Sequence, residues 1–364
     1  MENQETTNPK IDSDAGVPTE TLEETLLRIL GAFQIQSPGA FTIAGQVVAV
    51  DQAPVLPTAI AGPPLVAALQ QQLYANCFIQ PFGAPPAQRS MVITPDGDLG
   101  SALSQANVGR DRWDPSWYIT QVYPNGQIQI WKNGWFRQAS PGEYLTNGGP
   151  GAPPRVGMSA SLFLPRESNT LQPGFYFAFG EVVMDSLDES DGVIRLYWNV
   201  QDLGLPALVS LVTSTLNRFQ IPFRFKCLNH RALFPRLDAS LIYVHRRFFR
   251  MVADLMLDVR SKIDRFMMPA VPLFTRAIAP GLAIAEDPGN EPAIASGMHA
   301  ESFGTHRCRL LAEGMYRAYA AGLRSEGERL GEVMRHFENQ GICMHQPHLN
   351  PGSMDLYEMP EADR

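Results

Sequence analysis

Apolar and polar residues alternate most clearly in the segment 221–228. An extended backbone there places three apolar side chains on one face, which predicts a β-strand with one buried side. Arg224 and Lys226 share the opposite face about 7 Å apart, twice the rise per residue of a strand. The neighbouring cation and partial burial both disfavour the ammonium form of Lys226, so this amine is a candidate base near neutral pH. The alternative is a half-exposed strand that carries two solvated cations.

The segment 193–200 repeats this design. Three apolar side chains alternate there with Arg195, Tyr197 and Asn199. A cation, a phenol and an amide on one strand face are an unusual set for solvation alone, so we expect this face to take part in a polar site. A predicted helix at 203–219 joins this strand to the lysine-bearing one, and so short a connection predicts parallel or neighbouring strands in one sheet.

Basic residues gather around these strands, although the chain as a whole is acidic. A third predicted strand at 237–245 carries Tyr243. Between residues 218 and 250 there are eight Lys or Arg residues and the single acid Asp238, a local charge of +7 in a chain of net charge −8. This pattern disfavours a nucleic-acid partner and favours a discrete anion. The candidate anion ligands are Arg195, Arg224, Arg236, Arg246 and Arg307.

Elsewhere the pattern predicts an α+β fold. Two Asn-Gly turns separate alternating runs between residues 117 and 138, which indicates a three-stranded meander. Amphipathic periodicity predicts helices at 20–33, 65–76, 248–266, 302–322 and 325–339. We therefore expect a mixed or antiparallel twisted sheet with a β-meander and flanking helices. The stretch 272–288 is so broken by Pro and Gly that we expect no regular element in it.

Composition divides the chain into four expected regions. The polar, acidic segment 1–19 is predicted to be a disordered leader. It is followed by a helical and loop-rich region at 20–110, an α+β domain at 111–345 and a tail at 346–364. The candidate site lies in the third region.

Several functional classes are disfavoured by what the sequence lacks. The four cysteines form no CxxC pair and no secretory h-region is recognisable, so we expect reduced thiols in a cytoplasm. No apolar run of 18 residues occurs, which argues against a membrane span. The motifs of nucleotide, zinc-protease and serine-hydrolase sites are missing, and His345 and His348 lack the ligand set of a zinc site. We expect neither a metal nor an organic cofactor.

A lysine that can lose its proton, a tyrosine and several arginines suit the β-elimination of phosphate from phosphoserine or phosphothreonine. The base takes the α-proton, the arginines bind the phosphate and hold its charge as it leaves, and a donor stabilises the enolate or protonates the leaving oxygen. The same residues would also suit the capture of a phosphopeptide without chemistry, so both functions remain open.

Five segments, in this order and spacing, carry a resemblance to a known family. They are Arg195-Leu-Tyr197, 222–226, 236–243, 280–288 and 302–308. Together they cover roughly residues 118–322, and they resemble the HopA-type bacterial effector family. Relatives in that family serve as the lyase component in class V lanthipeptide and thioamitide biosynthesis.

The resemblance implies that a separate kinase phosphorylates Ser or Thr in a precursor peptide. The lyase, working with that kinase, then eliminates phosphate and leaves dehydroalanine or dehydrobutyrine. The implied partners are thus the phosphorylated precursor peptide and the kinase, with neither nucleic acid nor membrane.

A remoter similarity is to phosphothreonine lyases, which place a lysine base in a Phe-Lys strand and a histidine acid on an earlier strand. Phe225–Lys226 matches the first feature, but the earlier strand offers Tyr197 or Asn199 in place of histidine. We expect Lys226 to be the base, Tyr197 to be the donor because a phenol can give up a proton, and Asn199 to position the substrate. Tyr243 is expected to position the base or the substrate.

Two other functions stay open from the sequence. One is a non-catalytic module whose basic residues dock a phosphopeptide, a leader peptide or a kinase. The other is a translocated effector that acts on host phosphoproteins.

Overall fold

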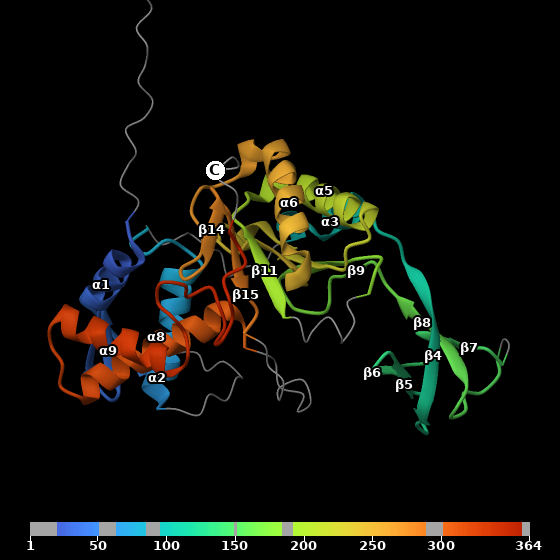
Figure 1. Cartoon of the computed structure of the whole chain (residues 1–364), viewed down its shortest axis with the longest axis horizontal. Coiled ribbons are helices and arrows are strands. Elements are labelled where there is room, and N and C mark those ends of the chain that lie inside the picture. Colours follow the sequence, from blue (N-terminus) through green and yellow to red (C-terminus); the bar gives the residue numbers. More distant parts are fainter. Residues whose placement is uncertain are drawn as a thin grey trace, which may run out of the picture.

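The computed structural model describes residues 20–50, 63–84, 95–148, 151–183, 192–288 and 301–358. These residues form seven α-helices and three sheets in which every strand pair is antiparallel, which confirms the α+β fold class (Figure 1). The predicted leader at 1–19 lies outside the described residues. None of the helices in the described part of the chain is long and apolar enough to cross a bilayer.

A seven-stranded sheet forms the centre of the molecule, in the order β14-β15-β11-β13-β12-β10-β9. Its strands are β9 (Glu167–Ser168), β10 (Phe175–Phe179), β11 (Val193–Trp198), β12 (Arg224–Leu228), β13 (Ser240–His245), β14 (Arg276–Ala279) and β15 (Leu282–Glu286). Both β11 and β12 pair antiparallel with β13, so they run parallel to each other with β13 between them. This confirms the predicted parallel relation and places Tyr197 and Lys226 on one sheet.

The two faces of this sheet pack against different helices. One face packs on α3 (Gly100–Ala106), α5 (Leu205–Arg218) and α6 (Phe249–Lys262). The apolar residues of the alternating segments point into this core, among them Leu196, Trp198, Phe223, Phe225 and Cys227. The predicted apolar faces of β11 and β12 are therefore confirmed.

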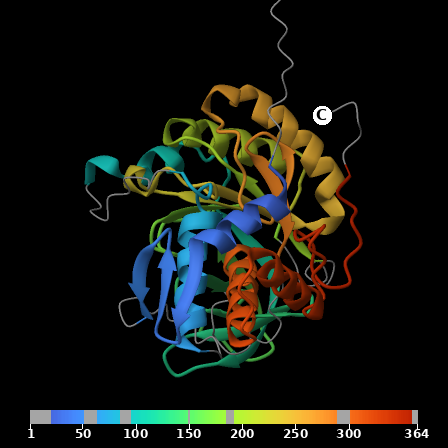
Figure 2. The same ribbon diagram turned by 90° about the vertical axis from the view of Figure 1, so that its left-hand side faces the viewer.

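The opposite face packs partly on a group of helices from both ends of the chain. This group contains α1 (Leu22–Ala32), α2 (Pro64–Leu73), α8 (Phe303–Ala320) and α9 (Glu326–Asn339). Figures 1 and 2 show it on the side of the sheet away from α5 and α6. A π-helical turn at Tyr74–Phe78 continues α2 toward the sheet. The N-terminal helices thus share one core with the C-terminal ones, and β1 (Phe33–Ser37), β2 (Ala40–Ile43) and β3 (Gln46–Ala49) form a small sheet beside them.

The predicted meander forms part of a separate sheet. Its strands are β4 (Arg112–Val122), β5 (Ile128–Lys132), β6 (Trp135–Ala139), β7 (Tyr144–Thr146) and β8 (Ser159–Leu164), in the order β6-β5-β4-β8-β7. This sheet projects from the main body and has a small apolar core of its own (Figure 1). The order β4-β5-β6 confirms the meander.

The prediction for 272–288 was wrong, because this stretch holds the hairpin of β14 and β15. Pro280 and Gly281 lie in the turn, where Gly281 has a positive φ of 74° that an L side chain rarely adopts. Every residue of β15 is buried, and the strand pairs with β11. The Pro and Gly residues that suggested irregular structure therefore form the tight turn of a hairpin.

Candidate active site

Lys226 lies on β12 with its amine against two aromatic rings of the neighbouring strand. Its Nζ atom is 3.9 Å from the ring centroid of Phe175 and 5.8 Å from that of Phe177. Burial lowers the pKa of Lys226 to about 8. Asp238 acts against this shift, whereas three nearby arginines lower the pKa further. The direction agrees with the expectation from the sequence, although burial has a larger effect than the neighbouring cations.

Side chains cross this face of the sheet in two parallel rows. One row runs from β10 to β11 through Phe177, Lys226, Leu241 and Tyr197. The other crosses β12, β13 and β11 through Arg224, Tyr243 and Arg195. Neighbouring strands are about 4.8 Å apart, so the backbones of Lys226 and Tyr197 are separated by about 10 Å, whereas Tyr243 lies on the strand next to Lys226.

Tyr243 is partly exposed between two guanidinium groups. Its ring centroid is 5.2 Å from Cζ of Arg195 and 6.0 Å from Cζ of Arg224. Arg195 is buried, and its Nε donates a 2.8 Å hydrogen bond to Asp287 Oδ2. Arg224 is exposed and, within the described ranges, pairs with no carboxylate. Arg224 is therefore a cation that is free to meet an anionic ligand.

A second polar group lies at the other end of the lysine-bearing strand. Arg236 binds the carboxylate of Asp238 in a bidentate fashion, at 2.7 Å from Nε and 2.8 Å from Nη2. The hydroxyl of Tyr74 donates to the same carboxylate at 3.1 Å. Burial alone would raise the pKa of Asp238, but Arg236 and these hydrogen bonds hold it below its usual value. Asp238 is therefore a buried carboxylate that stays ionised.

Tyr197 does not face the site in the way that the sequence suggested. Its side chain is 1% exposed and packs edge-on against Phe78, at 6.1 Å between ring centroids, and in a tilted arrangement against Phe303, at 6.3 Å. Burial raises the pKa of its hydroxyl, as it does for Tyr243, so the pKa does not distinguish the two phenols. A substrate arriving from solvent would not reach this phenol in the described conformation, whereas Tyr243 is partly exposed.

Arg246 lies on the other face of the sheet. The strand β13 ends at His245, and Arg246 begins a 3-10 turn in which it forms an ion pair with Glu286 at 3.5 Å. Glu286 stands opposite Ile194, which points into the core beneath α5 and α6. The structure therefore does not bring Arg246 to the phosphate-binding cluster proposed from the sequence.

Arg307 and Asn199 are also engaged elsewhere. Arg307 is fully buried, with Nε donating to the carbonyl of Pro347 at 2.8 Å and Nη2 to that of Leu349 at 2.7 Å. The side-chain amide of Asn199 donates to the carbonyl of Ala270 at 2.9 Å. These groups fix neighbouring chain segments, which argues against the ligand and substrate-positioning roles expected for them.

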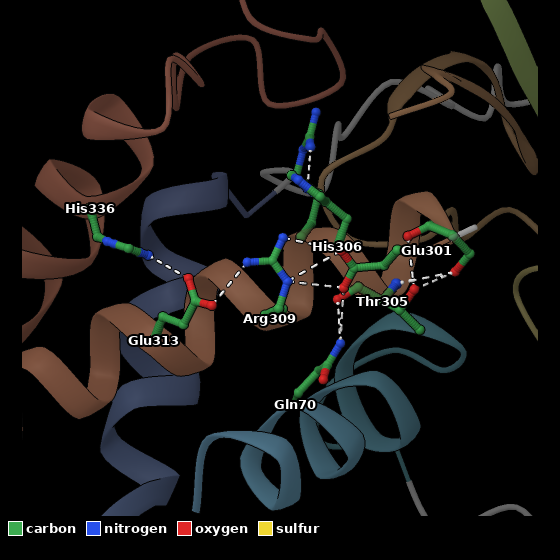
Figure 3. A network of polar contacts seen from close by, with 9 residues as sticks. Gln70, Glu301, Thr305, His306, Arg309, Glu313 and His336 are labelled. Atoms are coloured by element: carbon green, nitrogen blue, oxygen red, sulfur yellow. Dashed lines mark hydrogen bonds and ion pairs between the residues drawn. The ribbon is translucent and has the colours of Figure 1, made fainter. Parts of the chain in front are cut away.

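The start of α8 is a network of paired charges (Figure 3). Arg309 binds Glu301 at 3.1 Å and Glu313 at 2.9 Å, and Glu313 in turn contacts His336 at 2.8 Å. Burial, followed by the charge of the adjacent arginine, lowers the pKa of His306 to about 3, so this imidazole is neutral near pH 7. Glu301 and Glu313 thus neutralise the charge of Arg309. The contact between Glu313 and His336 links α8 to α9.

Three site residues escaped the sequence analysis. The aromatic alternation in Phe175–Phe179 is the signal that could have identified Phe175 and Phe177 as neighbours of the lysine. Nothing local to Tyr74 marks it, because its contact with Asp238 spans 164 positions in the chain. Only the packing of α2 on the sheet brings this phenol to the site.

No curated protein matches the chain. The solved structures similar to it include two of effector proteins from Pseudomonas syringae. That from pv. tomato strain DC3000 has a TM-score of 0.41 and 12% identity over 82% of this chain and 93% of the other. That from pv. syringae strain 61 has a TM-score of 0.39 and 12% identity over 77% of this chain and 88% of the other.

The family of the chain is shown by the match of its sequence to a family model. The model of the HopA1 effector protein family matches residues 166–349, which is half of the chain. The matched range runs from the end of β8 through the whole central sheet to the carbonyls that Arg307 binds, and it includes Lys226, Arg236 and Tyr243. The chain belongs to the HopA1 effector protein family.

Proposed function

We propose that this protein is a cofactor-independent lyase that eliminates phosphate from phosphoserine or phosphothreonine. Its substrate would be a precursor peptide phosphorylated by a separate kinase, and its product a peptide with dehydroalanine or dehydrobutyrine. One observation carries the proposal: an amine with a pKa of about 8 shares a sheet face with a partly exposed tyrosine and with an arginine that pairs with no carboxylate of the described residues. The resemblance to lanthipeptide and thioamitide lyases gives the substrate class.

The reaction divides between the two ends of this cluster. Neutral Lys226 takes the α-proton, and the electrons of the Cα–H bond form the Cα=Cβ double bond. The Cβ–O bond breaks, and phosphate leaves with the electron pair of that bond. Arg224 meets the leaving phosphate, which carries between one and two negative charges near pH 7 and therefore gains most from a guanidinium without a carboxylate partner.

Tyr243 is the proton donor in this scheme. Its phenol lies in the row of Arg224, one strand away from the base, whereas Tyr197 is sealed in the core. Arg195 packs on the same ring and is already paired with Asp287. Its main role is to hold Tyr243 in place and to add positive potential, with Arg224 making the direct contact to phosphate.

The protonation of Lys226 sets the pH range of the reaction. With a pKa of about 8, about a tenth of the molecules carry a neutral lysine at pH 7, and most do above pH 9. The value of kcat/KM should therefore rise with pH, reach half of its plateau near pH 8 and level off above about pH 9, because this parameter reports the free enzyme.

The test is mass spectrometry of a phosphorylated Ser/Thr peptide incubated with this protein alone. Wild-type protein should remove phosphoric acid, and Lys226→Ala should stop elimination while the phosphopeptide still binds. Lys262→Ala is the matched control, since Lys262 is exposed on α6 and pairs with Asp258. Retained turnover in Lys226→Ala would overturn the assignment of the base.

A second candidate function is phosphopeptide capture without chemistry. The ring of Phe175 lies 3.9 Å from the amine and attracts its ammonium form, which would bind phosphate without removing a proton. The two functions predict different effects of pH. For a lyase, the elimination rate should rise as the pH passes through 8. For a capture module, the affinity for the phosphopeptide should fall over the same range. Family membership also makes a host phosphoprotein an alternative substrate, which the same assay tests with a phosphoprotein in place of the peptide.

A further inference from the structure

We infer that Asp238, clamped by Arg236 and Tyr74, is a positioning residue that stabilises the ammonium form of Lys226 as the lysine takes the α-proton. This inference rests on the proposed elimination. It gives a joint role to Arg236, Asp238 and Tyr74, of which Tyr74 comes from the π-helical turn after α2 and lies outside the segments of the family resemblance.

The carboxylate is held in one orientation. Two hydrogen bonds from Arg236 and one from Tyr74 converge on it, at 2.7, 2.8 and 3.1 Å. The ring of Tyr74 is itself fixed by stacking on Phe78 at 5.4 Å between centroids. A carboxylate that is bound in this way cannot swing out to solvent, so its field on the neighbouring lysine is constant.

The ring of Phe175 joins this clamp to the lysine. The amine of Lys226 is 3.9 Å from its centroid, and Cζ of Arg236 is 5.9 Å from the same centroid. Of the groups that shift the protonation of Lys226, Asp238 is the carboxylate, and it favours the charged form. Asp238 is bound to Arg236, and Arg236 and the amine of Lys226 contact the same ring, so the carboxylate belongs to the cluster around the lysine.

The strand register places the two polar groups on opposite sides of the lysine. Lys226 stands opposite Leu241, and Arg224 stands opposite Tyr243, two residues further along β13. Asp238 lies in the other direction along the same chain, three residues before Leu241. The base thus has an anion on one side and the proposed phosphate-binding cation on the other, which matches the charges that develop when the lysine gains a proton and phosphate departs.

Pairing the carboxylate with Arg236 also prevents the lysine from becoming too basic. A bare buried carboxylate would hold Lys226 protonated, whereas the guanidinium offsets part of that attraction before the reaction. The charged and titratable groups around Lys226 come from five elements and connections. They are Arg195 and Tyr197 of β11, Arg224 of β12, Tyr243 of β13, Arg236 and Asp238 of the preceding connection, and Tyr74 of the π-helical turn.

Substitutions of the two members of the ion pair should shift the pH profile in opposite directions. In Asp238→Asn, the lysine loses its anion, so the rising limb of kcat/KM moves to lower pH and the plateau falls by on the order of tenfold to a hundredfold. In Arg236→Gln, no guanidinium offsets the negative charge of Asp238, so Lys226 keeps its proton to higher pH. The rising limb of kcat/KM therefore moves to higher pH. A merely structural role would lower the amount of active enzyme without moving the two limbs in opposite directions.

The closing experiment measures the titration of Lys226 in both variants by NMR of protein with ¹³Cε-labelled lysine, alongside the pH profiles. The chain has four lysines, so four signals are expected, and Lys226→Arg identifies the relevant one. A lower midpoint in Asp238→Asn and a higher one in Arg236→Gln support the inference, and either variant suffices if the other does not fold. Unchanged midpoints with an active wild type overturn this inference alone, whereas a wild type that eliminates no phosphate overturns the proposed function.

Discussion

Replacing Lys226 with methionine should stabilise the protein at neutral pH. Methionine keeps most of the unbranched stem but carries no charge. The pKa of Lys226 falls from 10.5 to about 8 on folding, and each pKa unit corresponds to about 1.4 kcal/mol, so the fold opposes the ammonium form by about 3 kcal/mol. The variant also loses the attraction between the amine and Phe175, worth about 1 kcal/mol. The expected net gain is about 2 kcal/mol.

The sign of the pH dependence follows from the same shift. Below pH 8, both the folded and the unfolded wild type hold the lysine proton, so the full penalty applies. Between about 8 and 10.5 the unfolded chain binds more protons than the folded one, and the stability contributed by this group rises with pH. The advantage of Lys226→Met should therefore be largest below pH 8 and fade toward pH 10.5.

Urea unfolding at several pH values measures this difference. Lys262→Met is the control, because Lys262 is exposed on α6 and should show no comparable gain. If Lys226→Met were destabilised at pH 6.5 while keeping its m-value, the lysine would be a stabilising cation in the fold, and the argument for a buried, readily deprotonated base would fail.

Five further substitutions test the assignments of individual side chains. Tyr243→Phe should lower the elimination rate about a hundredfold in a mass-spectrometric assay, whereas Tyr197→Phe should leave it within a few-fold; the reverse order would restore the buried phenol as donor. Arg224→Gln should weaken phosphopeptide binding about tenfold, as measured by fluorescence anisotropy. Arg246→Gln should not, because Arg246 lies on the other face of the sheet. Equal losses of affinity in the two variants would contradict the assignment of the two arginines to different faces. Arg307→Gln should lower the free energy of unfolding by about 2–3 kcal/mol, because two buried carbonyls lose their donors, and activity per folded molecule should persist. An activity loss without destabilisation would instead indicate a role in the site.

Local periodicity was enough to predict the faces of the central strands. The two-residue repeat of a strand is visible in the sequence, so Arg224 and Lys226 were correctly placed opposite the apolar core. The Asn-Gly turns predicted the meander for the same reason, since a tight turn is defined by its own residues. The Pro280–Gly281 turn was misread because the same residues that interrupt an isolated strand can also form the turn of a hairpin.

The assignment of individual arginines needed the folded structure. Eight cations between residues 218 and 250 look alike in the sequence, but acids from distant parts of the chain decide which are free. Arg246 meets Glu286, and Arg195 meets Asp287 across 92 positions. The burial of Tyr197 likewise depends on aromatic residues of α8 and the turn after α2, which no pattern near position 197 reveals.

The proposed elimination depends above all on a lysine that can lose its proton near neutral pH. A ¹³C titration of the labelled lysines in the wild-type protein measures this directly. One of the four signals should titrate near pH 8 and vanish in Lys226→Arg. Four signals that all titrate together near the ordinary lysine value of about 10.4 would contradict the account.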